Sequence, residues 1–270
     1  MDLSQCRVPD ATMFLLFVRA IVCLGLPIVL MLIWRKKTGA KLRSCLLGMA
    51  TFVIFALILE TILHNVVLLV LGEEKFTSTA FYAIYGGLAA GVFEEYGRYI
   101  VMRNFMKTDL EKKESVMFGI GHGGIESIIL IGTSTISSLA MAFTLNAGMG
   151  NMLIEGMSPD LQQQLYEQIS PLWLSAPPAV LAGIVERAFA ITYHICASYI
   201  VYRSVKDKKI SLCLLAVLLH ALMDGLAVTL SRLTGSALIT EAFIGIYTVI
   251  LAVFTVKAYK NEKEDTVIPE

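Results

Sequence analysis

Seven runs of apolar residues, each about as long as a membrane is thick, constrain this chain more than any other feature of its sequence. They cover residues 13–34, 44–71, 78–102, 115–145, 171–202, 210–232 and 237–257. A helix needs roughly 20 apolar residues to cross a bilayer. With 56% hydrophobic and only 16% charged residues, the chain is too apolar for a soluble domain, in which about 45–50% and about 25% are usual. We therefore predict an all-α, multi-pass bundle of about seven transmembrane helices in the cell membrane.

The basic residues are concentrated on one side of these runs. Sixteen of the 22 Lys and Arg residues fall in segments 35–43, 103–113 and 203–209 and among the C-terminal residues from Lys257 onward. Because Lys and Arg in short loops favour the cytoplasmic side, we predict that the N-terminus lies outside and the C-terminus in the cytoplasm. Residues 1–258 then form a single transmembrane domain, and residues 259–270 form a cytoplasmic tail that we expect to be disordered.

The connections between the runs are short, apart from residues 146–170 on the outer side. There, Ser158-Pro159-Asp160 offers an N-cap, a proline at the first helical position and an acid in the first turn. We therefore expect a short helix over residues 159–169 at the membrane interface. A formal net charge of zero implies no basic surface for nucleic acid.

Ionisable residues inside the runs are costly in lipid and are therefore candidates for function. They are Glu94, Glu95 and Arg98 in the third run, His122 and Glu126 in the fourth, Glu186, Arg187 and His194 in the fifth, and His220 and Asp224 in the sixth. Several are four residues apart and so share a helix face. A carboxylate one turn from a histidine can orient its ring or complete a metal site itself.

Four of these residues lie at one depth. Glu94, His122 and His194 are each nine residues from the nearest cytoplasmic basic residue, and His220 is eleven. At 1.5 Å per residue these distances are roughly 13–17 Å. Because successive helices run in opposite directions, we expect four separate helices to bring these side chains into one layer. Glu60 and His64 lie nearer the outer face, so we exclude them from the site and expect a local polar contact between them.

The charges in this layer do not balance. Five acids (Glu94, Glu95, Glu126, Glu186 and Asp224) face only Arg98 and Arg187. Burying three uncompensated negative charges is prohibitive, so either several acids are protonated or a divalent cation is bound. Three imidazoles at the same depth favour the cation, and zinc suits a mixed histidine and carboxylate site.

Each group also has a structural explanation when it is taken alone. Glu94 and Arg98 can form an ion pair within one helix, and a histidine inside a membrane often hydrogen-bonds to a neighbouring helix. The glycines around these groups indicate close packing of helices and can also make room for a substrate. They are Gly86, Gly87, Gly91, Gly119, Gly121, Gly123 and Gly124.

The polar motifs resemble those of a known class of enzymes. Glu94-Glu95-x-x-Arg98, Phe118-x-x-x-His122 and His220-x-x-x-Asp224 are similar to the motif series of intramembrane metalloproteases related to the CAAX prenyl endopeptidases and the PrsW proteases. With the additional Glu186…His194 element, the layout most resembles the YhfC-type branch. The prenyl endopeptidase motif places its arginine one residue further on, and PrsW relatives have Lys in place of Arg98 and Glu in place of His122.

The resemblance implies a role for each matching position. Glu94 would be the general base, and Glu95 and Arg98 would shape the site and help to hold substrate. His122 and His220 would be metal ligands, with His194 as a further ligand. Asp224 would be a ligand or would stabilise the transition state, while Glu126 and Glu186 would support the ligands or add to them. The choice of base between Glu94 and Glu95, and the identity of the metal, stay open at this point.

We therefore expect a zinc-dependent intramembrane endopeptidase that cleaves a membrane-associated protein or peptide. One alternative is a transporter or channel for a metal ion or a proton, because acids and histidines at mid-depth also line cation pathways. A second alternative is a membrane protein that keeps the fold without catalysis. The sequence leaves open the substrate, the oligomeric state and the side from which a substrate enters.

Overall fold

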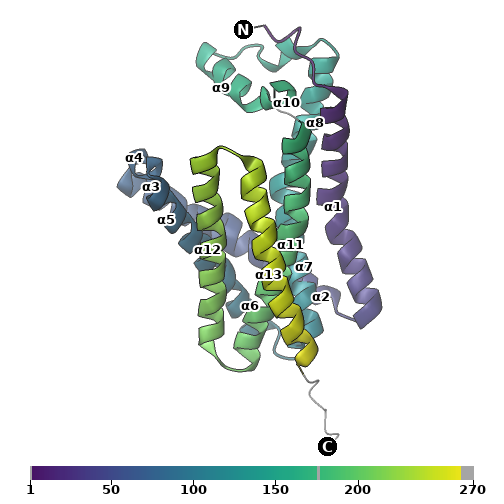
Figure 1. Ribbon diagram of the computed structural model, residues 1–270, viewed down its shortest axis with the longest axis vertical. Coiled ribbons are helices and arrows are strands. Elements are labelled where there is room, and N and C mark those ends of the chain that lie inside the picture. Colours follow the sequence, from purple (N-terminus) through teal and green to yellow (C-terminus); the bar gives the residue numbers. More distant parts are fainter. Residues whose placement is uncertain (1, 175–176, 263–270) are drawn as a thin grey trace, which may run out of the picture.

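The polypeptide forms an upright bundle of long helices in a computed structural model that describes residues 2–174 and 177–262 (Figure 1). Within those residues the regular structure is helical throughout, with no strand. Four long helices are single elements: α1 (Asp10–Thr38), α11 (Pro177–Lys206), α12 (Ile210–Thr234) and α13 (Ala237–Asn261). Three further helices each continue through a π-helical segment: α2 (Leu42–Thr51), η1 (Phe52–Glu60) and α3 (Thr61–Leu71); α5 (Thr79–Gly91), η2 (Val92–Tyr96) and α6 (Gly97–Phe105); α7 (Lys112–Glu126), η3 (Ser127–Gly132) and α8 (Thr133–Asn146). The short elements are α4 (Glu73–Thr77), η4 (Gly150–Leu153), α9 (Pro159–Ile169) and α10 (Pro171–Leu174).

This architecture confirms the predicted polytopic helix bundle. Among the described residues, six helices are long and apolar enough to cross a membrane. The predicted run 78–102 is also continuous helix, from α5 to α6, but it carries Glu94, Glu95 and Arg98 and is less apolar than the others. The count of seven and the orientation therefore stay predictions.

The π-helical segments lie where polar residues occur. Segment η2 contains Glu94 and Glu95, η1 ends at Glu60, and η3 begins directly after Glu126. A π-turn widens the helix by one residue and is frequent at functional sites.

Glycines bring the backbones of α7, α2 and α11 into direct contact. A Cβ atom added at Gly121 would lie 2.1 Å from the carbonyl oxygen of Cys45, and one at Gly119 would lie 2.6 Å from Cα of Ile195. Gly91 allows the same close approach of α5 to α12, with 2.6 Å to the carbonyl oxygen of Val217. These contacts confirm the predicted packing role of the three glycines. Gly86 differs, because an added Cβ would meet nothing within 4 Å.

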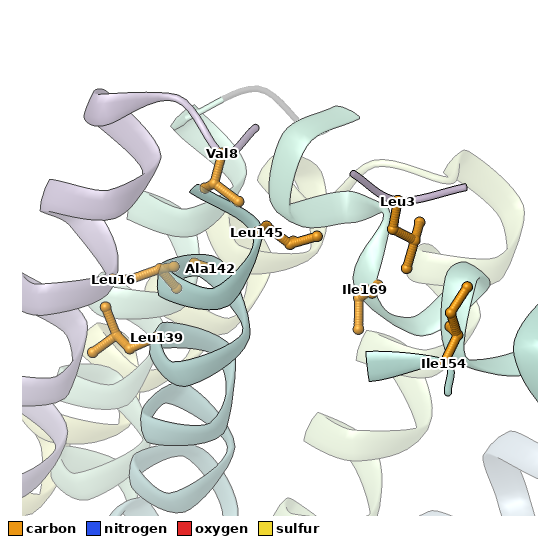
Figure 2. Packing of buried hydrophobic residues seen from close by; sticks show 8 residues of the cluster. All are labelled: Leu3, Val8, Leu16, Leu139, Ala142, Leu145, Ile154 and Ile169. Atoms are coloured by element: carbon orange, nitrogen blue, oxygen red, sulfur yellow. The ribbon is translucent and has the colours of Figure 1, made fainter. Parts of the chain in front are cut away.

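The end of the bundle near the N-terminus is covered by the long connection between α8 and α11. Helix α9 begins at Pro159, and the Ser158 hydroxyl accepts from the backbone N–H of Leu161 at 3.5 Å, as the sequence predicts. The N-terminal segment packs against this connection through one apolar cluster (Figure 2). The cluster comprises Leu3, Val8, Leu16, Leu139, Ala142, Leu145, Ile154 and Ile169.

The opposite end carries the basic loops. Lys41 Nζ donates to Asp109 at 2.5 Å and Arg43 donates to the same carboxylate at 3.2 Å, which joins two connections and lowers the pKa of Asp109. Helix α13 continues to Asn261. The expected disorder of residues 259–270 is therefore wrong at 259–261, where helical hydrogen bonding extends beyond the apolar run, and residues 263–270 lie outside the described part.

Candidate metal centre

Four helices place ionisable side chains at one point in the interior of the bundle, since η2 and α6 belong to one continuous helix. Segment η2 supplies Glu94 and Glu95, α6 supplies Arg98, and α7, α11 and α12 supply His122, His194 and His220. All six residues are buried, with at most 7% of their surface exposed. The structure thus brings together every residue of the predicted layer.

The three histidines converge on the carboxylate of Glu94. Nε2 of His122 lies 2.9 Å from Glu94 Oε2, and Nδ1 of His194 lies 3.8 Å from the same oxygen. Nε2 of His220 lies 3.9 Å from Glu94 Oε1. One ligand atom from each of Glu94, His122 and His194 falls within 4.8 Å of the others, which is close enough for one metal ion to bind all three.

Carboxylates contact the other ring nitrogen of two of these histidines. Nε2 of His194 contacts Glu126, and Nδ1 of His220 donates to Glu95 Oε1 at 2.7 Å. A carboxylate on the second nitrogen fixes the tautomer and orientation of a histidine that binds a metal. Asp224 lies on the side of His220 that faces Glu94, with Oδ2 3.4 Å from Nε2.

Arg98 is fully buried between the acids and His194. Its guanidinium donates to Glu95, to Glu94 at 3.2 Å and to Nδ1 of His194 at 2.6 Å. Because an arginine can only donate, Nδ1 of His194 must be an acceptor, and the ring proton lies on Nε2 facing Glu126. The lone pair of Nδ1 is therefore directed at Arg98, and a metal ion bound by this nitrogen would take the place of that hydrogen bond.

A second cationic group lies on the far side of Glu126. Arg187 donates to Glu126 at 3.2 Å and to Glu186. Glu186 accepts from this arginine, so the structure links it to the site through Arg187 and Glu126. Two arginines are thus shared among four acids, with Asp224 in addition, so the predicted excess of acidic over cationic side chains is present in the folded chain.

A comparison with known families matches the same part of the chain. The model of the family described as "YhfC intramembrane metalloprotease" matches residues 22–247. The chain belongs to this family. It is also 37% identical, over 225 residues, to a protein of Bacillus subtilis (strain 168) named "Uncharacterized membrane protein YhfC". That match covers 83% of this chain and 86% of the relative. No solved structure matches this chain.

Membership in the YhfC family confirms the predicted resemblance and makes this chain a multi-pass membrane protein. The wider relation to the CAAX and PrsW proteases stays a prediction. Glu60 and His64 form the local polar contact that the sequence predicts, because Nε2 of His64 lies 3.1 Å from Glu60 Oε1. The other nitrogen of His64 lies 2.8 Å from the hydroxyl of Tyr85, a contact that the sequence did not predict.

Two aromatic groups of this YhfC-family site were missed by the sequence analysis. Tyr193 is fully buried, and its ring lies 5.6 Å from that of His194 and 5.2 Å from that of His220. Phe52 packs edge-on to His122 at 5.4 Å. Neither has a sequence signal, because aromatic residues in an apolar run are ordinary membrane filling.

Proposed function

We propose that this YhfC-family protein is a zinc-dependent intramembrane endopeptidase that hydrolyses a peptide bond of a membrane-associated protein or peptide. The observation that carries the proposal is the convergence of three imidazole nitrogens on Glu94, each within 3.9 Å of its carboxylate. The family description agrees with this chemistry.

The donor set suits a divalent metal. Two of the histidines carry a carboxylate on the nitrogen that faces away from Glu94, which is the usual support of zinc ligands. The local excess of acids over arginines supplies the charge that a divalent cation would neutralise. We assign His122, His194 and His220 as the ligands. Zinc held by such ligands supplies Lewis acidity and makes water acidic enough to react near neutral pH.

We assign the general base to Glu94 instead of Glu95. Glu95 is fully buried, and one of its oxygens already accepts from Arg98 and from His220. Glu94 lies among the histidines, where its carboxylate can take a proton from water and pass it to the leaving amine. In this assignment Arg98 holds both acids in place. Its hydrogen bond to Nδ1 of His194 would give way to a metal ion bound by that nitrogen.

The proposal is tested first by the metal content of the purified protein. We expect about one zinc ion per wild-type chain, the ratio of a single mononuclear site, and its loss in the double variant His122→Ala/His194→Ala. The matched control is His64→Ala, which removes a membrane histidine that also has a glutamate one turn away but lies outside the cluster. Gel filtration and circular dichroism establish that each variant is folded.

Proteolysis is then measured on the zinc-loaded protein, with Glu94→Gln as the inactive control that keeps the histidines. A folded wild type that binds no metal after zinc is added would contradict the proposal. Zinc binding without proteolysis in any membrane-protein or peptide screen would favour the non-catalytic alternative.

One observation favours a cation pathway as the second candidate. The hydrogen-bonded chain Glu60–His64–Tyr85 continues polar groups beyond the metal centre. In reconstituted vesicles, zinc or proton flux that is lost in His122→Ala would support transport over hydrolysis.

A further inference from the structure

A cavity of about 470 Å³ lies beside the metal centre, between α3, α5 and α12. Its polar lining includes His64, Asn65, Tyr85 and Asp224, and Gly86 forms part of its wall. Helices α3 to α5 lie to one side of α12 in Figure 1. The sequence predicts only a local contact between His64 and Glu60, whereas the structure places His64 in the same cavity as Asp224, a residue of the predicted site.

Asp224 connects this cavity with the buried cluster. Its side chain lines the cavity and is 36% exposed, whereas the side chains of the other nine predicted site residues are at most 15% exposed. Its Oδ2 lies 3.4 Å from Nε2 of His220. The accessible space that reaches the candidate ligands on this side therefore passes Asp224.

The opposite side of the cluster is closed by apolar packing. One to three turns beyond the polar layer, the helices that carry it share a buried cluster. The cluster comprises Val101, Met102, Met106, Phe118, Tyr199, Val201, Tyr202 and Ala216. These residues lie toward the predicted cytoplasmic end, so the packing separates the site from that end. The cavity between α3, α5 and α12 has a residue of the predicted site, Asp224, in its lining.

The lining of the cavity shows which chemistry fits it. Phe76, Tyr82 and Tyr85 line it with aromatic rings, and the Phe76 ring lies 5.7 Å from that of Tyr85. Asn65 adds a hydrogen-bonding group. A dry cavity of about 150 Å³ accommodates a benzene ring, so this cavity has room for an aromatic side chain and the adjoining peptide backbone. Asp224 disfavours an acidic residue.

We infer that this cavity is the substrate cleft, and that it binds an extended peptide segment with a large apolar side chain next to the scissile bond. The inference rests on the proposed endopeptidase function and adds to it the class of substrate and the side of approach. Aromatic rings bury the side chain, Asn65 binds the backbone, and Asp224 lies where the segment meets the metal centre.

Gly86 offers a way to fill the cleft without disturbing the fold. An added Cβ at Gly86 meets nothing within 4 Å, and the same holds for Gly25 in α1, which is outside the cavity. The test therefore compares Gly86→Leu with the matched control Gly25→Leu. Val228→Trp obstructs the cleft from α12 and serves as a second blocking variant if Gly86→Leu fails to fold.

The probes are two zinc-binding hydroxamates, acetohydroxamate and phenylalanine hydroxamate, with Kd measured by calorimetry on zinc-loaded protein. In the wild type we expect the benzyl group to tighten binding by about tenfold or more, because its burial in an apolar cleft is favourable. Gly86→Leu or Val228→Trp should abolish this gain and leave acetohydroxamate binding unchanged. Gly25→Leu should keep the gain.

The other possible outcomes contradict either the cleft or the proposed function. Equal binding of the two hydroxamates to the zinc-loaded wild type, binding of neither, or a gain that survives in a folded blocking variant would overturn the cleft. A wild type that binds no zinc would instead overturn the proposed function, and with it the substrate class inferred here.

Discussion

At the scale of single residues, the distinctive feature is how the histidines are held. The nitrogen of His194 that faces away from Glu94 contacts Glu126, and that of His220 contacts Glu95. Nδ1 of His122 has no hydrogen-bond partner among the described residues, and its ring is fixed instead by the surrounding aromatic groups. Loss of a supporting carboxylate should therefore affect the three histidines unequally.

Glu126→Gln tests this support directly. Glutamine keeps the size of the side chain but removes the charge that favours the Nε2–H tautomer of His194, so we expect zinc affinity to fall by about 10- to 100-fold. Affinity is measured by competition with a chelator of known strength. The matched control is Glu186→Gln, because both acids contact Arg187 but Glu126 is the one placed against His194. Equal losses of zinc affinity in the two variants would show that the negative charge near the site sets the affinity, and that the contact with His194 does not.

The residues of the site could be predicted because depth and spacing are encoded along the chain. Counting from the basic loops placed Glu94, His122, His194 and His220 in one layer, and the structure brings them together. The sequence could not show that Arg98 donates to His194, since they are 96 positions apart. Nor could it place His64 beside Asp224, because that requires knowing how α3 and α12 are oriented.

At the scale of helices, the position of the metal centre depends on backbone contact. Gly121 lies against the carbonyl oxygen of Cys45 in α2, and Gly119 against Ile195 in α11. Because α7 lies this close to α11, the rings of His122 and His194 are 5.0 Å apart. A side chain at either glycine would move α7 away from its neighbours.

Gly121→Ala should therefore destabilise the protein. The new methyl group would meet backbone at 2.1 Å, and overpacking of this kind costs about 1–3 kcal/mol. The measurement is thermal unfolding in detergent, with zinc content on the same samples. Gly25→Ala is the control, because its Cβ enters open space and alanine is the better helix former. If Gly121→Ala unfolds at the wild-type temperature, the close contact does not exist.

The sequence predicts some features of the helices better than others, because some depend on local signals and others on packing. Helix α9 could be bounded in advance because a serine cap and a first-turn proline act locally. The predicted span at residues 78–102 is helical but less apolar than the others, because Glu94, Glu95 and Arg98 lower its mean hydropathy. The π-helical turns had no sequence signal, since they arise where tertiary packing widens a helix.

At the scale of the whole molecule, the two ends of the bundle differ in charge. Segments 35–43, 103–113 and 203–209, which span the junctions of α1 with α2, α6 with α7 and α11 with α12, hold thirteen of the 22 basic residues. In Figure 1 the C-terminal end of α13 lies at the bottom of the bundle, and α9 with the N-terminus lies at the top. The connection that contains α9, residues 147–176, has no Lys or Arg. The fold thus separates an end rich in basic residues from the end that carries α9 and the N-terminus. This separation is what the positive-inside rule expects of a membrane protein with a fixed orientation.

Cysteine labelling in intact cells tests the predicted orientation. Thr108 lies exposed in a basic connection and Gln164 lies exposed in α9. Both are introduced as cysteine in a Cys6→Ala background, because the other four cysteines are buried. The positive-inside rule predicts that Gln164→Cys reacts with a membrane-impermeant maleimide in intact cells, whereas Thr108→Cys reacts only after permeabilisation. The reverse pattern would invert the bundle, and the cleft beside α12 would then approach the metal centre from the cytoplasmic half of the membrane.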